Sequence, residues 1–63
     1  MPSFDEDLLI AALRGDILRL SALLAAKANV DAVNSSSKTA LHLAAEKGHV
    51  FAVRVLLGGG ATP

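Results

Sequence analysis

The apolar residues of the chain fall into four short clusters, which polar or glycine-containing segments separate. Leucine and alanine dominate these clusters, and both are strong helix formers. The clusters cover residues 8–14, 17–26, 40–47 and 50–57. Gly15 and Asp16 lie between the first two clusters, and Gly48 and His49 lie between the last two. The pattern therefore predicts an all-α fold built from two antiparallel helix pairs.

Polar residues mark the ends of these helices. Ser3 and Glu6 have the spacing of a capping box, and acidic residues at 5–7 favour a helix amino terminus, so the first helix is expected to begin near Asp5. Thr39 is expected to cap the third helix, and the glycines at 58–60 to end the fourth. Residues 27–38 are rich in asparagine and serine, which predicts a loop or a short hairpin there.

The two halves of the chain repeat each other with a period of 33 residues. The segment 38–49 also resembles the T-P-L-H-x-A-A-x-x-G-H stretch of the ankyrin repeat family. Over residues 8–30 the identical pairs are Leu8/Leu41, Ala11/Ala44, Ala12/Ala45, Gly15/Gly48, Leu23/Leu56, Leu24/Leu57 and Ala28/Ala61. The resemblance implies a fragment of an α-solenoid with two repeats, residues 1–33 and 34–63, joined by a short finger loop.

Three residues depart from the family pattern. Ala40 stands where the family usually has proline, while Ser37 and Lys27 stand where it usually has glycine. Alanine is a good helix former, so the change at position 40 should cost little. A positive φ angle is unfavourable for the other two residues, so their turns are expected to relax to other conformations. The finger around residues 35–38 is expected to be irregular or poorly ordered.

Composition and charge exclude several classes of function. Six basic residues balance six acidic ones, the isoelectric point is near 6.7, and tryptophan and tyrosine are absent, which argues against nucleic-acid binding. The longest apolar run is far shorter than the roughly 20 residues that span a bilayer, so no membrane association is expected. The acidic start lacks the features of a signal peptide, and the chain has no cysteine. A cytoplasmic or nuclear protein is expected.

The candidate chemistry points to structural roles instead of catalysis. His42 and His49 are seven residues apart, which does not match the i, i+4 spacing of metal ligands on one helix face. The family resemblance implies that His42 bonds to Thr39 and that His49 ties the loop after Gly48 to a helix. No nucleophile has a nearby base, and no phosphate-binding sequence is present. The chain is expected to have no enzymatic activity, no metal and no cofactor.

The resemblance implies a protein–protein interaction module that presents a concave surface. The finger and the exposed side of the first helix of each repeat would contact the partner protein. The residues at these places are Leu13, Arg14, Val33, Ser35, Ser36, Lys38, Glu46 and Lys47. Two alternatives remain: a self-associating structural unit or truncated piece of a longer array, and an inhibitory module attached to an enzyme, which would require further sequence.

The fourth helix suggests self-association. Between residues 50 and 57 only Arg54 is polar, whereas a surface helix should have a single apolar stripe. Leu9 and Leu18 suggest that the first repeat also has an apolar end. We expect a homo-oligomer, with a two-fold dimer favoured over end-to-end stacking, through the outer face of the second repeat with Phe51 and Val55.

Overall fold

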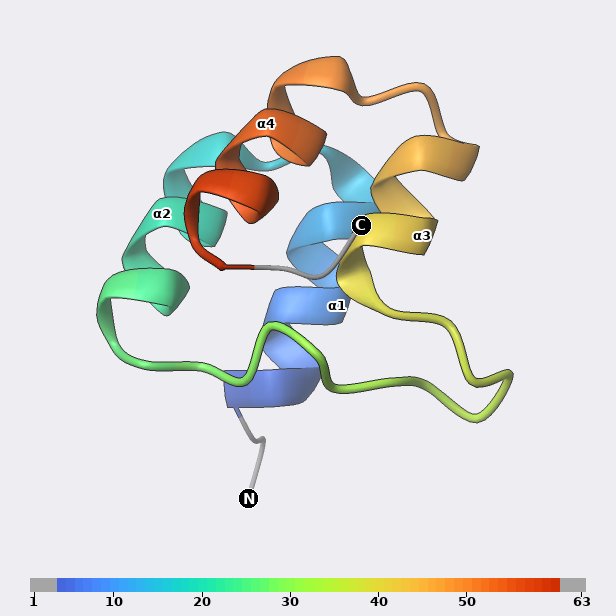
Figure 1. Ribbon diagram of the computed structural model, residues 1–63, viewed down its shortest axis with the longest axis horizontal. Helices are drawn as coiled ribbons and strands as arrows, with labels where there is room; N and C mark the ends of the chain where they lie inside the picture. Colours follow the sequence, from blue (N-terminus) through green and yellow to red (C-terminus); the bar gives the residue numbers. More distant parts are fainter. Residues whose placement is uncertain (1–3, 61–63) are drawn as a thin grey trace.

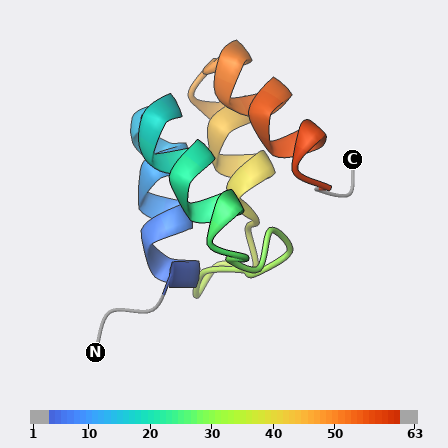
Figure 2. The same ribbon diagram turned by 90° about the vertical axis from the view of Figure 1, so that its left-hand side faces the viewer.

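The computed structural model describes residues 4–60, which form four α-helices in two antiparallel pairs. Figures 1 and 2 show the pairs side by side, with α1 next to α3 and α2 next to α4. We call α1 and α2 the first helix pair, and α3 and α4 the second. The helices are α1 (Phe4–Arg14), α2 (Ile17–Ala25), α3 (Ala40–Glu46) and α4 (Val50–Gly58).

The predicted helices are confirmed, and their ends shift by about one residue. The first helix begins at Phe4 instead of Asp5, and the second ends at Ala25 instead of Ala26. The third helix stops before Lys47, which becomes its C-cap, and the fourth continues to Gly58. The predicted cap Ser3 lies outside the described residues.

Leucine and alanine form the core between the two helix pairs. Leu8, Leu20 and Leu56 are the largest side chains without solvent contact. Burial of such a leucine stabilises the fold by about 1.5–3 kcal/mol. Ala44 and Ala52 are equally buried, and their small side chains let neighbouring helices approach closely. The core therefore combines buried leucines with close helix packing at the alanines.

The turn within each helix pair uses the same hydrogen-bond pattern. Gly15 and Gly48 adopt φ angles of 71° and 72°, which glycine adopts without strain. The residue after each glycine donates its backbone N–H to a carbonyl in the preceding helix: Asp16 to Ala11, and His49 to Ala44, both at 2.9 Å. These bonds form the Schellman motif that commonly ends helices.

The turns at Lys27 and Ser37 keep the left-handed conformation, so the expectation that they would relax is wrong. Their φ angles are 69° and 60°. Lys27 donates its backbone N–H to the carbonyl of Leu24, and Ala28 donates to Leu23, which again closes a Schellman motif. Helix-closing hydrogen bonds thus compensate for the unfavourable backbone angle of a residue other than glycine.

The finger is a regular turn, so the expectation of an irregular segment is also wrong. Val33 and Thr39 form an antiparallel bridge, and we call the segment between them the 33–39 turn. Asn34 Oδ1 accepts hydrogen bonds from the backbone N–H groups of Ser36 (2.9 Å) and Lys38 (3.1 Å). The Asn34 N–H also donates to the Lys38 carbonyl at 3.0 Å. One asparagine therefore organises the whole turn.

Candidate functional site

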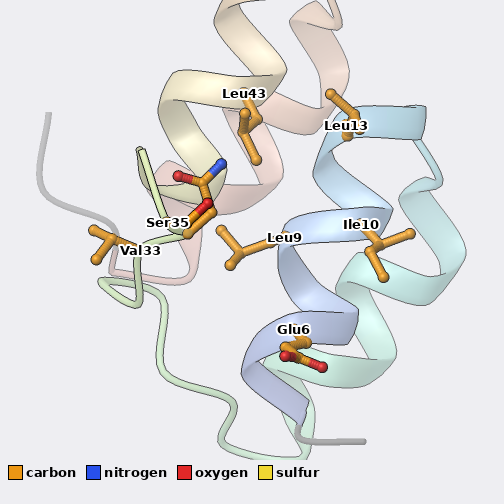
Figure 3. Close-up of a pocket in the computed structure, with 8 residues that line it drawn as sticks. Glu6, Leu9, Ile10, Leu13, Val33, Ser35 and Leu43 are labelled. Carbon is orange, nitrogen blue, oxygen red and sulfur yellow. The ribbon is translucent and has the colours of Figure 1, made fainter. Parts of the chain in front are cut away.

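A groove of about 470 Å³ lies between α1, α3 and the 33–39 turn (Figure 3). Its lining is mainly aliphatic, with polar groups contributed by α1 and the 33–39 turn. The lining residues are Glu6, Leu9, Ile10, Leu13, Val33, Asn34, Ser35 and Leu43. We call this hollow the concave groove.

The helical period brings the α1 residues of the concave groove together. Glu6, Ile10 and Leu13 are spaced by four and three residues, which places them on one helix face. Leu9 and Leu43, one from each helix pair, are almost fully buried, whereas Ile10 and Val33 are 48% and 52% exposed. Such an apolar surface is typical of sites that contact another molecule.

The concave groove contains three of the eight predicted partner-binding residues: Leu13, Val33 and Ser35. The other five do not line it, and they are Arg14, Ser36, Lys38, Glu46 and Lys47. The sequence prediction missed the other five lining residues, which are Glu6, Leu9, Ile10, Asn34 and Leu43. A signal was present for Leu9 and Ile10, because residues 8–10 and 13 give α1 more apolar positions than one buried face requires.

Lys38 and Glu46 form an ion pair on the surface beside the 33–39 turn. Lys38 Nζ lies 2.7 Å from Glu46 Oε1. The hydrogen bond from Lys38 holds the pKa of the Glu46 carboxyl below its usual value. Both side chains remain largely solvated, and such pairs contribute little to stability. The pair instead holds two opposite charges together beside the 33–39 turn.

Thr39 and His42 form a capping box at the start of α3. The Thr39 hydroxyl accepts a hydrogen bond from the His42 backbone N–H at 3.2 Å. His42 Nδ1 in turn accepts from the Thr39 backbone N–H at 3.4 Å, and lies 2.9 Å from the Thr39 hydroxyl. A histidine that accepts at Nδ1 carries its proton on Nε2. These contacts give His42 a structural role, as the second residue of the capping box.

His49 joins the two helix pairs. Its Nε2 lies 3.1 Å from the carbonyl oxygen of Leu13, in the last turn of α1. Gly15 packs closely against the same ring: a Cβ atom at this position would lie 2.8 Å from His49 Nδ1. The histidine thus satisfies a helix-end carbonyl across the pair boundary, which ties α1 to the turn between α3 and α4.

Phe51 and Val55, the residues predicted for self-association, differ in their exposure. Phe51 is 72% exposed, but its counterpart Leu18 in the first helix pair is 85% exposed although another helix pair lies beside it. Lateral packing therefore does not bury this position. Val55 is partly buried against the core, while its counterpart Ala22 is exposed. Phe51 and Val55 are thus not on the outer face of the second helix pair.

Leu9 requires a related correction. It does not form an apolar end of the stack, because it is 8% exposed and lines the concave groove opposite Leu43.

Within residues 4–60, no group of three or more His, Asp or Glu side chains is arranged to hold a metal ion. Across the same residues, every helix is too short or too polar to cross a membrane.

Two helical hairpins, each with a tight turn between its helices, pack side by side. This is the architecture of a helical repeat protein. The family model described as "Ankyrin repeats (3 copies)" matches residues 5–63. The chain belongs to the ankyrin repeat family. Ankyrin repeats are generally protein–protein interaction modules, and the family is typically not enzymatic. The described residues 4–60 contain two helix pairs, whereas the family model is built from three repeat copies.

Proposed function

We propose that the protein binds a partner protein through the concave groove. The observation that carries this proposal is the cluster of half-exposed aliphatic side chains Ile10, Leu13 and Val33 around two buried leucines. Core packing does not require these three residues to be apolar. They offer a site for aliphatic or aromatic side chains of a partner, which usually supply most of the binding energy at an interface.

Hydrogen bonds hold two walls of the concave groove in place, which favours binding. The capping box of Thr39 and His42 fixes the start of α3, and Asn34 fixes the 33–39 turn. Association therefore avoids much of the entropy loss that accompanies the ordering of flexible loops. The surrounding polar residues would orient the partner and raise the rate of association. They are the predicted residues Arg14, Ser36, Lys38, Glu46 and Lys47.

The test compares two variants that each replace two exposed apolar residues by glutamine. Ile10→Gln with Leu13→Gln alters the concave groove, whereas Leu18→Gln with Phe51→Gln alters more exposed residues elsewhere. We expect the first variant to lose about 2 kcal/mol or more of binding energy, roughly 30-fold in affinity, and the second to bind normally. The wild-type chain is first used to capture and identify partner proteins. Calorimetry then measures the affinity of the wild type and of each variant for such a partner. Equal affinities of the two variants would refute the proposal.

A second candidate function is assembly with copies of the same chain, with a dimer as the favoured form. The observation that favours it is the exposure of aliphatic residues on α4, where Val50 and Leu57 contact solvent. Burial of such surface drives most protein association. Sedimentation equilibrium at micromolar concentration tests it: a folded monomer throughout would rule out this function.

A further inference from the structure

The two most exposed large apolar side chains of residues 4–60 occupy equivalent positions beside the tight turns. Leu18 is 85% exposed and Phe51 is 72% exposed. Leu18 lies in the first turn of α2, and Phe51 lies in the first turn of α4. Val50, next to Phe51, is exposed as well. Core packing therefore does not account for the apolar character of these three residues.

Stacking of helix pairs does not cover this position either. The first pair has its neighbour on one side, and the second pair has its neighbour on the other (Figures 1 and 2). Leu18 and Phe51 are nevertheless both exposed, so the side on which the neighbour lies makes no difference. A further helix pair at either end of the stack would leave them exposed. A ligand for these side chains has to approach from the edge of the stack.

The two tight turns form one edge of the molecule. Figures 1 and 2 show both turns at the top, opposite the 33–39 turn and the start of α1. We call residues 14–19 and 47–51 the turn edge. A hollow of about 330 Å³ joins its two halves, because Gly15 and Gly48 both line it, together with the apolar side chains of Ile17, Val50 and Phe51. None of the residues that line the concave groove belongs to the turn edge.

The turn edge is basic, although the chain as a whole has no net charge. It contains Arg14, Arg19 and Lys47 but a single acidic residue, Asp16, which gives a formal charge of +2. Asp16 pairs with Arg19 at 3.7 Å, and no ion pair within residues 4–60 involves Arg14 or Lys47. The compensating negative charge lies elsewhere, and the acidic residues at 5–7 are at the opposite edge. The charge of the molecule is therefore polarised along its helices.

Projecting apolar side chains flanked by basic residues are suited to the surface of an anionic lipid bilayer. Phenylalanine and leucine enter the boundary between headgroups and acyl chains, and lysine and arginine are attracted to anionic headgroups. A fluid layer accommodates a side chain that projects into it, whereas a protein partner would need a pocket of matching shape for each one. The charge and the protrusion of the turn edge thus both favour a lipid surface.

We propose that the turn edge docks on an anionic bilayer, with Leu18, Val50 and Phe51 in the lipid interface and Arg14 and Lys47 at the headgroups. This contact goes beyond the binding of a protein in the concave groove and does not depend on it. The sequence expectation of no membrane association considered the length of apolar runs, which decides only whether a helix can span the bilayer. Contact with the surface requires no such run.

The first experiment compares two variants of the full chain that each replace one leucine and one phenylalanine. Leu18→Gln with Phe51→Gln alters the turn edge, whereas Phe4→Gln with Leu57→Gln alters exposed residues at the opposite ends of α1 and α4. Flotation with vesicles of phosphatidylcholine and phosphatidylserine measures the partition coefficient. We expect the first variant to lower it at least about tenfold and the second to leave it unchanged. Circular dichroism checks that each variant is helical.

The second experiment tests the charge of the turn edge. Arg14→Gln with Lys47→Gln should weaken binding to the mixed vesicles at least about tenfold, because each basic residue near an anionic surface contributes to the attraction. Lys27→Gln with Lys38→Gln removes the same charge from outside the turn edge and should weaken binding clearly less. Vesicles of phosphatidylcholine alone should bind the wild type poorly, and added salt should weaken binding to the mixed vesicles.

A label at a single position shows which edge meets the lipid in an almost unaltered chain. The chain has no cysteine, so one cysteine at position 51 or 57 can carry a nitrobenzoxadiazole fluorophore. We expect a blue shift of its emission with the mixed vesicles at position 51 and none at position 57, because only the first label would enter the apolar interface.

Several results would overturn the proposal. They are a wild-type chain that floats with neither kind of vesicle, equal losses in the two apolar variants, or equal shifts of the two labels. If Leu18→Gln with Phe51→Gln abolishes capture of a protein while the wild type ignores vesicles, the turn edge binds a protein instead. Binding in the concave groove is measured with soluble partners, so its outcome is independent of all these results.

Discussion

The two helix pairs follow one backbone plan, yet they differ in the surfaces that they expose. The first pair has Leu9 and Leu13 where the second has His42 and Glu46. The leucines line the concave groove, whereas His42 completes the capping box of α3 with Thr39 and Glu46 pairs with Lys38. A few substitutions in a repeated scaffold therefore decide which helix face lines an apolar groove and which carries a helix cap and an ion pair.

The largest expected difference between the pairs concerns the same substitution at equivalent leucines. Leu8→Ala should lower the free energy of unfolding by about 2–5 kcal/mol, since the side chain is fully buried and a cavity remains. Leu41→Ala should cost clearly less, because solvent already reaches this residue. Denaturant unfolding at low protein concentration, where a dimer would dissociate, measures both. Equal costs would show that the outer side of the second pair is covered in the monomer.

The two turn glycines provide the next comparison. Both have positive φ, so alanine should cost about 1–2 kcal/mol at either position. Gly15→Ala should cost more than Gly48→Ala, because its Cβ atom would collide with the ring of His49, while the space around Gly48 is open. Thermal unfolding of the two variants tests the order. If Gly48→Ala is the more damaging, the contact between Gly15 and His49 does not limit stability.

The capping box at the start of α3 provides the next test of the second helix pair. Thr39→Ala removes the hydroxyl that accepts from the His42 backbone N–H, and should cost about 0.5–2 kcal/mol. Ser36→Ala serves as the control, since only the backbone of this exposed serine bonds to Asn34. Denaturant midpoints of the two variants decide the question. An unchanged midpoint for Thr39→Ala would mean that water replaces the cap without loss.

A stabilising change is expected at the end of the first pair. Lys27 has a positive φ angle, and its counterpart in the second pair is Gly60, with φ of 97°. Lys27→Gly should therefore raise the free energy of unfolding by about 0.5–1 kcal/mol, because glycine adopts this conformation without strain. Lys47→Gly is the control, because Lys47 has negative φ and glycine should not stabilise there. Chemical denaturation of both variants would show whether the gain is specific.

The sequence was sufficient to predict the helices but not the geometry of every turn. The period of 33 and the breaks at Gly15 and Gly48 depend on local chemistry, which a pattern reveals. The left-handed angles of Lys27 and Ser37 were not predicted, because the compensating hydrogen bonds involve residues on both sides of each turn. The preference of a residue for negative φ concerns one position only. At Lys27 and Ser37 the surrounding hydrogen bonds outweigh that preference.

The site was harder to predict than the fold. Leu13, Val33 and Ser35, predicted to contact a partner, line the concave groove, whereas Ile10 was not predicted because an apolar helix position usually indicates core. The positions of Phe51 and Val55 were hard to predict for a different reason. A helix that is apolar on all sides indicates that more than one of its faces is buried. Only the three-dimensional arrangement shows which neighbour packs against each face.

The smallest expected effect belongs to the ion pair of the second helix pair. The first pair has Asp5 and Leu13 at the positions of Lys38 and Glu46. Because the hydrogen bond from Lys38 lowers the pKa of Glu46 in the folded chain, the pair stabilises the fold above the usual range of carboxyl pKa values. This stabilisation is lost as the pH falls through the lowered pKa, since the protonated carboxyl no longer attracts the ammonium.

Lys38→Met should therefore remove a small stabilisation at neutral pH and leave the stability in strong acid almost unchanged. Both side chains are largely solvated, so added salt should weaken the effect further. The measurement compares unfolding of the wild type, Lys38→Met and Glu46→Gln from neutral to acidic pH, and nuclear magnetic resonance titration follows the Glu46 carboxyl. If the Glu46 pKa is the same in Lys38→Met as in the wild type, the contact at 2.7 Å is not maintained in solution, and the two charges act as independent solvated groups.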